Sequence, residues 1–187
     1  EYESLFDEST VFLVRTQGVG YTKAEEMVNH GVTGPNVRAA GVDYDVRWAH
    51  PYSVYSELDW APAVERSSVK GADCYDRYRV RVTEMVESAN MVLEALERMP
   101  GGAETHYEPG DPAIIAKAPS RAPEGTFGSH HFEDSRGESM FHIVGGGDGR
   151  GKNPYRVSIR SPMFITIPYA SKCMIGYKVA DIPAIMG

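Results

Sequence analysis

The sequence predicts an α+β fold that combines one long bundle helix with a small antiparallel β hairpin. From Tyr75 to Met99, apolar residues recur at alternating spacings of three and four, the pattern of one face of an α-helix. From Tyr155 to Arg160, apolar and polar residues alternate, the pattern of a half-buried strand. The glycine-rich stretch 145–151 precedes this strand and predicts the hairpin turn. The 187 residues suffice for one domain with its own core.

The long helix has clear signals at both ends. Asp73 is a suitable N-cap, and Asp76 places a negative charge in the first turn, where it suits the helix dipole. Arg98 lies in the last turn, and the Pro-Gly-Gly run at 100–102 stops the helix. The predicted apolar stripe consists of Tyr75, Tyr78, Val82, Met85, Ala89, Val92, Leu96 and Met99. We expect this stripe to pack incompletely on the hairpin or on a C-terminal helix, which would leave an apolar patch exposed.

The N-terminal part of the chain carries weaker signals. A capping box that begins at Thr22 predicts a short helix that ends near Asn29. The stretch 31–51 is rich in Gly, Asn and Asp and has no clean period, so we expect an ordered loop there.

The C-terminal half is expected to carry the remaining elements. The stretch 101–128 is rich in Gly, Pro, Glu and Ser, and we expect it to be an exposed insertion within a single unit that spans 1–187. Residues 139–144 are expected to form the first strand of the hairpin. Residues 170–186 are expected to form a helix that Pro183 interrupts.

The composition excludes several classes of protein. The net charge is −7 and the pI is about 5.4, which argues against a nucleic-acid partner, because such partners are bound through Lys and Arg. No apolar run approaches the roughly 20 residues that cross a bilayer. The two cysteines, Cys74 and Cys173, lie far apart and indicate a reducing compartment such as the cytosol. Because the chain starts without Met and stops on an apolar run, we expect it to be an internal piece of a larger protein.

Two candidate binding sites are weak. The glycine-rich stretch 145–151 lacks the following helix and the Lys-Ser or Lys-Thr pair of a phosphate-binding loop, so a plain turn is favoured. His130 and His131, with Glu133 and His142 nearby, suggest a metal site. Adjacent histidines point to opposite faces of a strand, however, so structural or surface histidines are favoured and no metal is expected.

Two charged loops are better candidates. Asp43, Asp45 and Arg47 can form a buried ion-pair network, because charges buried in a loop must satisfy one another. A structural role is favoured, with relay of protons or charge as the alternative.

In the second loop, Arg136 stands among acidic residues beside a glycine and could present a fixed cation to a pocket. On the residues alone, a surface salt bridge to Glu133, Asp134 or Glu138 is favoured.

These loops carry a resemblance to a known family. Residues 34–47 and 51–55 resemble the run LTGxxLRxSGxxYDxRKxxPYxxY of the complex I D subunit, the 49-kDa type. Further matches, in the same order as in that family, are 73–84 with GDxYDRxLVRxxEM, 135–138 with ESxRGE, 154–164 with PYRxKxRxPSF, and 180–187 with the motif that precedes SxDPxxxxxDR. Five motifs in the right order make the resemblance specific, and it covers nearly the whole chain except 101–128.

The resemblance implies a fold related to the large subunit of nickel–iron hydrogenases and a role in reducing quinone. In the whole NADH–quinone oxidoreductase, electrons would pass to quinone from an iron–sulfur cluster in the neighbouring B-type small subunit, with proton translocation in the membrane arm. A C-type subunit would be a further partner, and the protein would lie peripherally on the cytoplasmic side of the cell membrane. NADH and quinone would be used by the whole complex, whereas the chain itself would bind no cofactor and have no catalysis alone.

The resemblance also assigns residues. Arg136 matches the arginine above the metal in related hydrogenases and is the expected catalytic-site residue. Asp43, Asp45, Arg47 and Glu138 are expected to form the supporting charge network. The family's quinone-contacting His and Tyr lie upstream of Glu1. Alternatives are a subunit of an energy-converting nickel–iron hydrogenase, of a deazaflavin-dependent dehydrogenase, or a non-catalytic scaffold.

Overall fold

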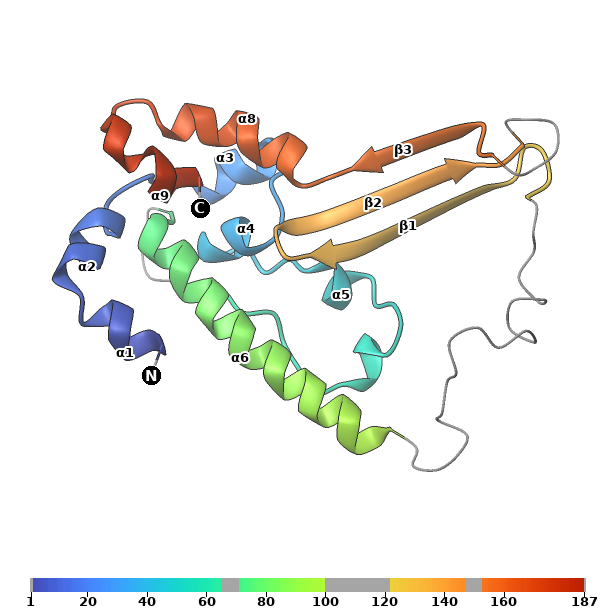
Figure 1. Ribbon diagram of the computed structural model, residues 1–187, viewed down its shortest axis with the longest axis horizontal. Coiled ribbons are helices and arrows are strands. Elements are labelled where there is room, and N and C mark those ends of the chain that lie inside the picture. The colour runs from blue at the N-terminus through green and yellow to red at the C-terminus, as the bar shows by residue number, and fades with distance from the viewer. Residues whose placement is uncertain (1, 65–70, 100–121, 147–152, 187) are drawn as a thin grey trace.

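The chain forms a group of helices from which a β-sheet extends to one side (Figure 1). A computed structural model describes residues 2–64, 71–99, 122–146 and 153–186. The described elements, in chain order, are α1 (Tyr2–Asp7), α2 (Thr10–Thr16), α3 (Ala24–Asn29), α4 (Pro35–Ala39), α5 (Val46–Ala49), the 3-10 turn η1 (Tyr55–Glu57), α6 (Cys74–Arg98), β1 (Phe127–Asp134), β2 (Gly137–Val144), β3 (Arg156–Arg160), α8 (Met163–Cys173), the 3-10 turn η3 (Val179–Asp181) and α9 (Ile182–Met186). The predicted α+β class is confirmed.

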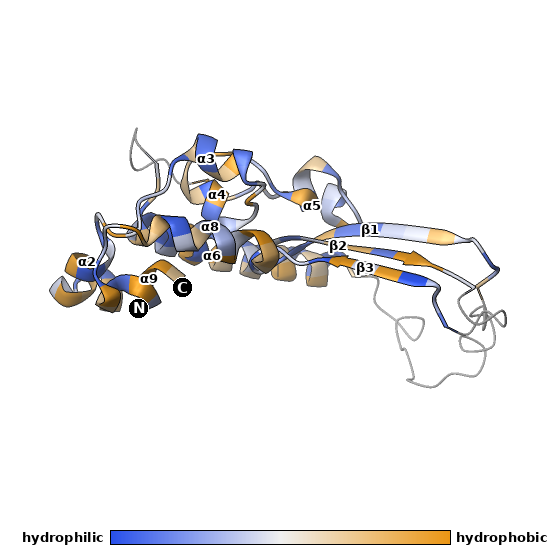
Figure 2. Cartoon of the chain, turned by 90° about the horizontal axis from the view of Figure 1, so that it is seen from above, coloured by the Kyte–Doolittle hydropathy of each residue, from blue (hydrophilic) through white to orange (hydrophobic). Residues whose placement is uncertain are grey.

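The sheet contains the predicted hairpin and one strand that the sequence did not predict. The described strands form an antiparallel sheet in the order β1-β2-β3, and Phe141 on β2 lies opposite His130 on β1 and Ile159 on β3. Phe127 and Gly128, which were assigned to the insertion, begin β1, whereas 100–121 lie outside the described residues, as do 147–152 of the hairpin turn. Figure 2 shows the sheet continuing beyond the helices as a single layer.

The long helix is confirmed, with a different packing partner. Asp73 caps α6 as predicted, since its carboxylate accepts a hydrogen bond from the backbone N–H of Asp76, and the Asp76 carboxylate accepts one from the N–H of Asp73. The helix packs mainly on α4 and also contacts α2, rather than packing chiefly on the hairpin or the C-terminal helix. Val80, which is not in the predicted stripe, meets Ala39 and Ala72 in a small buried cluster. The rotation of α6 is therefore set by its contact with α4.

Part of the predicted stripe is exposed, as expected. Met85, Val92, Leu96 and Met99 are each more than half exposed. Leu93, on the same part of α6, is 60% exposed. The C-terminal half of α6 therefore presents an apolar surface.

Two N-terminal predictions need correction. The helix near Asn29 exists, but Thr22 does not cap it. Its N-cap is Lys23, which makes no side-chain capping bond, and the Thr22 hydroxyl instead donates to the carbonyl of Ala72 at 3.0 Å. The stretch 31–51 is not only loop, because it contains α4 and α5. Helices this short show no apolar period, so the sequence pattern could not reveal them.

The C-terminal helix begins earlier than predicted. α8 starts at Met163 and continues through Pro168, and the chain then turns before η3 and α9. Proline normally ends a helix because it lacks the N–H and crowds the preceding turn. Here Tyr169 and Ala170 are buried directly after it, so packing keeps the helix intact. Tyr169 joins Met27, Val32 and Val37 in a second buried cluster.

No helix in the described parts of the chain is both long and apolar enough to cross a membrane.

Candidate functional site

The turn between β1 and β2 is held in place by two glycines that pack together. Gly137 has φ +126°, and a Cβ there would lie 2.7 Å from the Thr33 hydroxyl. A Cβ on Gly34 would lie 2.4 Å from the Gly137 Cα. The N–H of Glu138 donates to the Thr33 hydroxyl at 3.0 Å. These contacts seat the turn against the loop before α4 and thereby fix the position of Arg136.

Arg136 has no acidic partner among the described residues, so the favoured surface salt bridge is absent there. The acids near it in the chain are used elsewhere. Glu133 pairs with Arg38 at 3.0 Å, and one oxygen of Asp134 accepts from the N–H of Ser135 at 2.7 Å. Glu138 contacts other groups, as described below. The Arg136 guanidinium is therefore available to a group outside the described chain.

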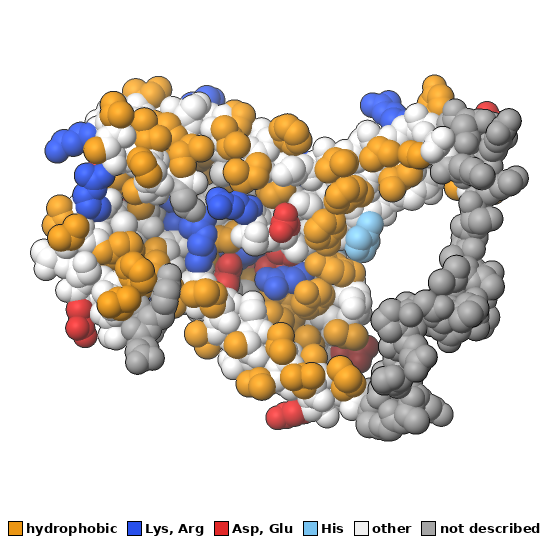
Figure 3. All heavy atoms as spheres, viewed as in Figure 1, with side chains coloured by type: hydrophobic (Ala, Val, Ile, Leu, Met, Phe, Trp, Pro, Cys, Tyr) orange, Lys and Arg blue, Asp and Glu red, His pale blue; other side chains and the backbone are white. Residues whose placement is uncertain are grey.

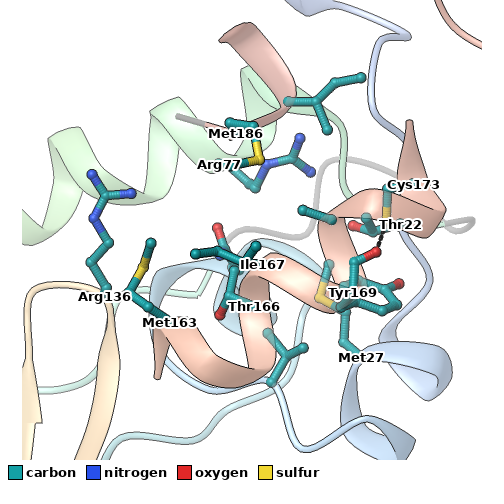
Figure 4. Close-up of a pocket in the computed structure, with 14 residues that line it drawn as sticks. Thr22, Met27, Arg77, Arg136, Met163, Thr166, Ile167, Tyr169, Cys173 and Met186 are labelled. Carbon is teal, nitrogen blue, oxygen red and sulfur yellow. Dashed lines mark hydrogen bonds between the residues drawn. The ribbon is translucent and has the colours of Figure 1, made fainter. Parts of the chain in front are cut away.

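Arg136 lines an apolar pocket (Figure 4). It reaches from the β1–β2 turn toward α6, and Arg77 comes from α6 on the other side of Met163. The rest of the lining comes from α3, α4, α8, α9 and the loops beside them and is mostly apolar, with no acidic side chain among the described residues. The space open to the centres of water molecules is about 40 Å³, which is enough for a few waters, since one needs roughly 10–15 Å³. A larger ligand would therefore extend beyond the pocket mouth.

A buried charge network lies behind the turn. The Arg38 guanidinium is 2% exposed and contacts carboxylates of Asp45 at 3.2 Å, Glu84 at 2.7 Å and Glu133 at 3.0 Å. Arg47 pairs with Asp45 at 2.8 Å. Three carboxylates thus share two guanidinium groups, which leaves one negative charge in excess. Burial raises the pKa of Glu133, although Arg38 opposes the shift.

The predicted network was partly right. Asp45 and Arg47 pair as expected, and Asp45 also caps α5 by accepting from the N–H of Arg47 at 2.9 Å. Asp43 is exposed and makes no hydrogen bond or ion pair with another described residue. The hub, Arg38, was missed because its partners come from distant parts of the chain, and no local spacing connects them.

Glu138 belongs to a second, more exposed group. Its carboxylate accepts from the Tyr44 hydroxyl at 3.3 Å, lies 2.7 Å from His131 Nδ1, and lies 3.6 Å from Arg160. Burial, followed by the charge of Glu138, raises the pKa of Tyr44. Glu138 therefore fixes the base of β2 next to the buried network without joining it directly.

The histidines do not converge. His131 lies beside Glu138, whereas His130 packs edge-on against Tyr52, with ring centroids 5.4 Å apart. Among residues 2–64, 71–99, 122–146 and 153–186, no group of three or more His, Cys, Asp or Glu side chains is arranged to hold a metal ion.

Arg77 and Arg81 are charged residues of this region that the sequence analysis missed. They stand four residues apart on α6, so the two like charges lie on one face of the helix. That spacing is visible in the sequence and could have marked the position, because like charges at this spacing destabilise a helix unless something compensates them.

Comparison with known proteins gives consistent matches along the whole chain. The model of the family described as respiratory-chain NADH dehydrogenase, 49 Kd subunit, matches residues 1–187. The D subunit of the NADH-quinone oxidoreductase of Flavobacterium johnsoniae is 40% identical over 201 residues, covering 97% of this chain and 46% of that protein. The D subunit of the F(420)H(2) dehydrogenase of Methanosarcina mazei is 36% identical over 187 residues, covering 100% of this chain and 47% of that protein.

A solved structure shares the fold. A chain of the membrane-bound sulfane sulfur reductase, an archaeal respiratory membrane complex, superposes with a TM-score of 0.81 and 30% identity, covering 99% of this chain and 47% of that chain. The likeness is consistent with the predicted hydrogenase-large-subunit-like fold. The chain spans about half the length of these relatives.

Proposed function

The chain belongs to the family of the 49 kDa subunit of the respiratory-chain NADH dehydrogenase, and we propose that the pocket beside Arg136 forms one wall of the quinone-reducing site of the whole protein. The observation that carries the proposal is the Arg136 guanidinium, which stands at a mostly apolar pocket without an acidic partner among the described residues. An apolar surface with two fixed cations, Arg136 and Arg77, suits a ligand that is neutral and apolar before reduction and gains negative charge during it.

The chemistry of quinone reduction explains why a cation is useful there. As electrons arrive, negative charge develops on the quinone oxygens until protons neutralise it. A guanidinium stays charged at any physiological pH and offers several N–H donors in a rigid plane. A donor held in place before the charge develops stabilises it without reorganisation, and such stabilisation is often the largest single contribution to catalysis.

The size of the pocket supports a site shared between two subunits. A space of about 40 Å³ for the centres of water molecules holds only a few waters, so a quinone would extend beyond the mouth of the pocket. Its other wall would come from the neighbouring iron–sulfur small subunit, whose cluster supplies the electrons. In this proposal the whole protein also contacts a C-type subunit and lies peripherally at the cytoplasmic face of the membrane. The chain 1–187 alone would have no turnover.

Substitution of Arg136 tests the proposal. In membranes that contain the assembled complex, Arg136→Ala should lower quinone reductase turnover while the subunit content stays normal. Normal turnover in that variant would contradict the proposal.

A second candidate is the corresponding subunit of a deazaflavin-dependent dehydrogenase. It is favoured by the match to the D subunit of the F(420)H(2) dehydrogenase, whose coverage of this chain is complete. The two candidates share the site at Arg136 and differ in the electron donor. Oxidation of NADH compared with oxidation of reduced F420 in the same membranes distinguishes them.

A further inference from the structure

A second hollow, which shares Arg77 with the pocket beside Arg136, lies between α2, α6 and α9. Its volume is about 290 Å³, and Arg15, Arg77 and Arg81 all line it. No acidic side chain among the described residues lines the hollow. Figure 3 shows basic side chains near the middle of one face of the molecule, with acidic side chains among them and hydrophobic side chains around them.

Two of these arginines have no carboxylate partner among the described residues. Arg77 is 5% exposed and donates to the Gly20 carbonyl at 3.0 Å and to the Cys74 sulfur at 3.1 Å. Arg81 donates to the Asn36 side-chain oxygen at 3.3 Å and to the Arg77 carbonyl at 3.4 Å. All of these acceptors are neutral.

The acids that could neutralise the arginines are already paired. Glu84, one turn beyond Arg81, lies 2.7 Å from Arg38. Asp181 pairs with Arg15 at 3.1 Å. Apart from Arg15, the described arginines that form ion pairs do not line this hollow. Arg77 and Arg81 therefore bring positive charge into a partly buried place where neither has a paired carboxylate among the described residues.

Uncompensated charges of this kind are unfavourable, and an arginine cannot relieve them by losing its proton. Burial lowers the pKa of Arg81, and the charges of Arg77 and Arg136 lower it further, against the pull of Glu84. An anion placed in the hollow would offset the repulsion between these guanidinium groups. A carboxylate is the anion whose geometry matches the planar fork of a guanidinium.

We propose that the hollow between α2, α6 and α9 is a docking site for an acidic side chain of a partner polypeptide, held by Arg77 and Arg81. The apolar residues that line the hollow favour a polypeptide over a free anion. Phe12 from α2, Tyr78 from α6 and Ala184 from α9 form this part of the lining. Arginine surrounded by apolar contact area is typical of the energetically important centre of a protein interface.

The inference rests on the proposed function only for the existence of a neighbouring subunit. Arg77 lines both the hollow and the pocket beside Arg136, whereas Arg81 lines the hollow and not that pocket, so the docking proposal is tested first at Arg81.

Zero-length cross-linking tests the contact. In membranes that contain the assembled complex, Arg81→Lys places an amine in the hollow, and a water-soluble carbodiimide joins an amine only to a carboxylate in contact with it. Mass spectrometry of the products should show a link from position 81 to an Asp or Glu of another subunit. Lys23 and Glu26, whose charged groups lie 3.4 Å apart, give a link in every sample and verify the reaction. Arg156→Lys, at an exposed arginine without an ion pair to a described residue, is the matched control and should give no such link.

The outcomes are decisive. A link between position 81 and an acid of another subunit supports the proposal, and replacing that acid by its amide should abolish the link. If the Lys23–Glu26 link forms but position 81 links only within this chain or to nothing, the proposal is overturned.

If Arg81→Lys prevents assembly, Arg77→Lys makes the same measurement from the neighbouring position. Thermal stabilisation of the assembled complex by inorganic phosphate, without any link, would mean that the hollow takes a free anion and would also overturn the proposal. Neither result depends on turnover, so both are independent of the Arg136 test.

Discussion

The guanidinium of Arg38 and the carboxylate of Glu133 lie 3.0 Å apart although 95 residues separate them in the chain. Both side chains are almost completely buried, at 2% and 4% exposure. The contact joins α4 to the end of β1 directly behind the turn that carries Arg136. The buried network therefore links the helices to the sheet and supports the candidate site.

Removal of Arg38 should be strongly destabilising. Arg38→Met leaves the carboxylates of Asp45, Glu84 and Glu133 buried without their shared cation, and loss of one partner of a buried ion pair typically costs about 3–5 kcal/mol. Chemical denaturation measures the free energy of unfolding. Lys23→Ala is the control, because it removes a cation from an exposed pair with Glu26, where the expected cost is at most about 1 kcal/mol. Equal effects of the two substitutions would show that the network contributes no more than a surface pair.

Glu133 should make folding depend on pH in an unusual direction. Burial raises its pKa in the folded state above the ordinary value of 4.5. Between the unfolded and folded pKa values the folded state holds more protons, so the contribution of Glu133 to stability is greatest in acid and is lost as pH rises through the folded pKa. Glu133→Gln removes this titration. Denaturation at a series of pH values gives the free energy of unfolding of the native protein and of the variant. The native value minus the variant value should fall as pH rises from 4.5. A difference that stays constant or rises with pH would show that the pKa of Glu133 is not raised.

Gly137→Ala should loosen the β1–β2 turn. The new Cβ would lie 2.7 Å from the Thr33 hydroxyl and 2.8 Å from its backbone, at a φ of +126° that L side chains rarely adopt. We expect a loss of at least about 1–3 kcal/mol in the free energy of unfolding, the usual cost of a strained backbone conformation. Gly128→Ala, in β1, is the control, because its Cβ would meet nothing within 4 Å and its φ is not in the left-handed region. If Gly137→Ala is no more costly than Gly128→Ala, the close packing of the turn on Thr33 and Gly34 is not required.

The exposed apolar surface of α6 should drive self-association of the chain when it is purified alone. Val92, Leu93 and Leu96 are 58–60% exposed and belong to one stretch of the helix, and apolar surfaces of this kind usually mark contact sites. Sedimentation velocity should show a dimer or larger species that Leu93→Glu shifts toward monomer. Ser171→Glu adds the same charge at an exposed polar position outside α6, on α8, and should have little effect. A native chain that stays monomeric at high concentration would contradict this expectation.

The sequence predicted the parts of the fold that have strong local patterns. The period of three and four in α6, its cap at Asp73 and the alternation in β3 are all properties of neighbouring residues. The helix, the cap and the strand are confirmed. The expected burial of the apolar face of β3 is wrong for the described chain, because Val157 and Ile159 are 46% and 54% exposed. β1 was missed because its sequence, FGSHHFED, has no clean alternation, so its pairing with β2 decides its conformation. The continuation of α8 through Pro168 was missed for a similar reason, since burial of the residues after the proline outweighs its local preference.

The candidate site divides in the same way. Asp45 and Arg47 could be paired from the sequence because two positions separate them. The contacts of Arg38 with Glu84 and Glu133 depend on how α6 and β1 pack on α4, which no local pattern specifies. The lack of an acidic partner for Arg136 among the described residues could not be predicted either, because its neighbours Glu133 and Glu138 are acidic and only the fold shows that both are already paired.

Turnover of the assembled complex tests most directly whether Arg136 acts on the quinone. Quinone reductase activity should be measured in membranes with Arg136→Ala, Arg136→Lys and the control Arg156→Ala, after the subunit content of each has been matched. We expect Arg136→Ala to lower turnover by about a hundredfold, the scale of one donor that stabilises a developing anion. Arg136→Lys should restore it only in part, since lysine lacks the planar fork, and Arg156→Ala should leave it unchanged. Turnover of Arg136→Ala equal to that of Arg156→Ala, at equal subunit content, would contradict the account.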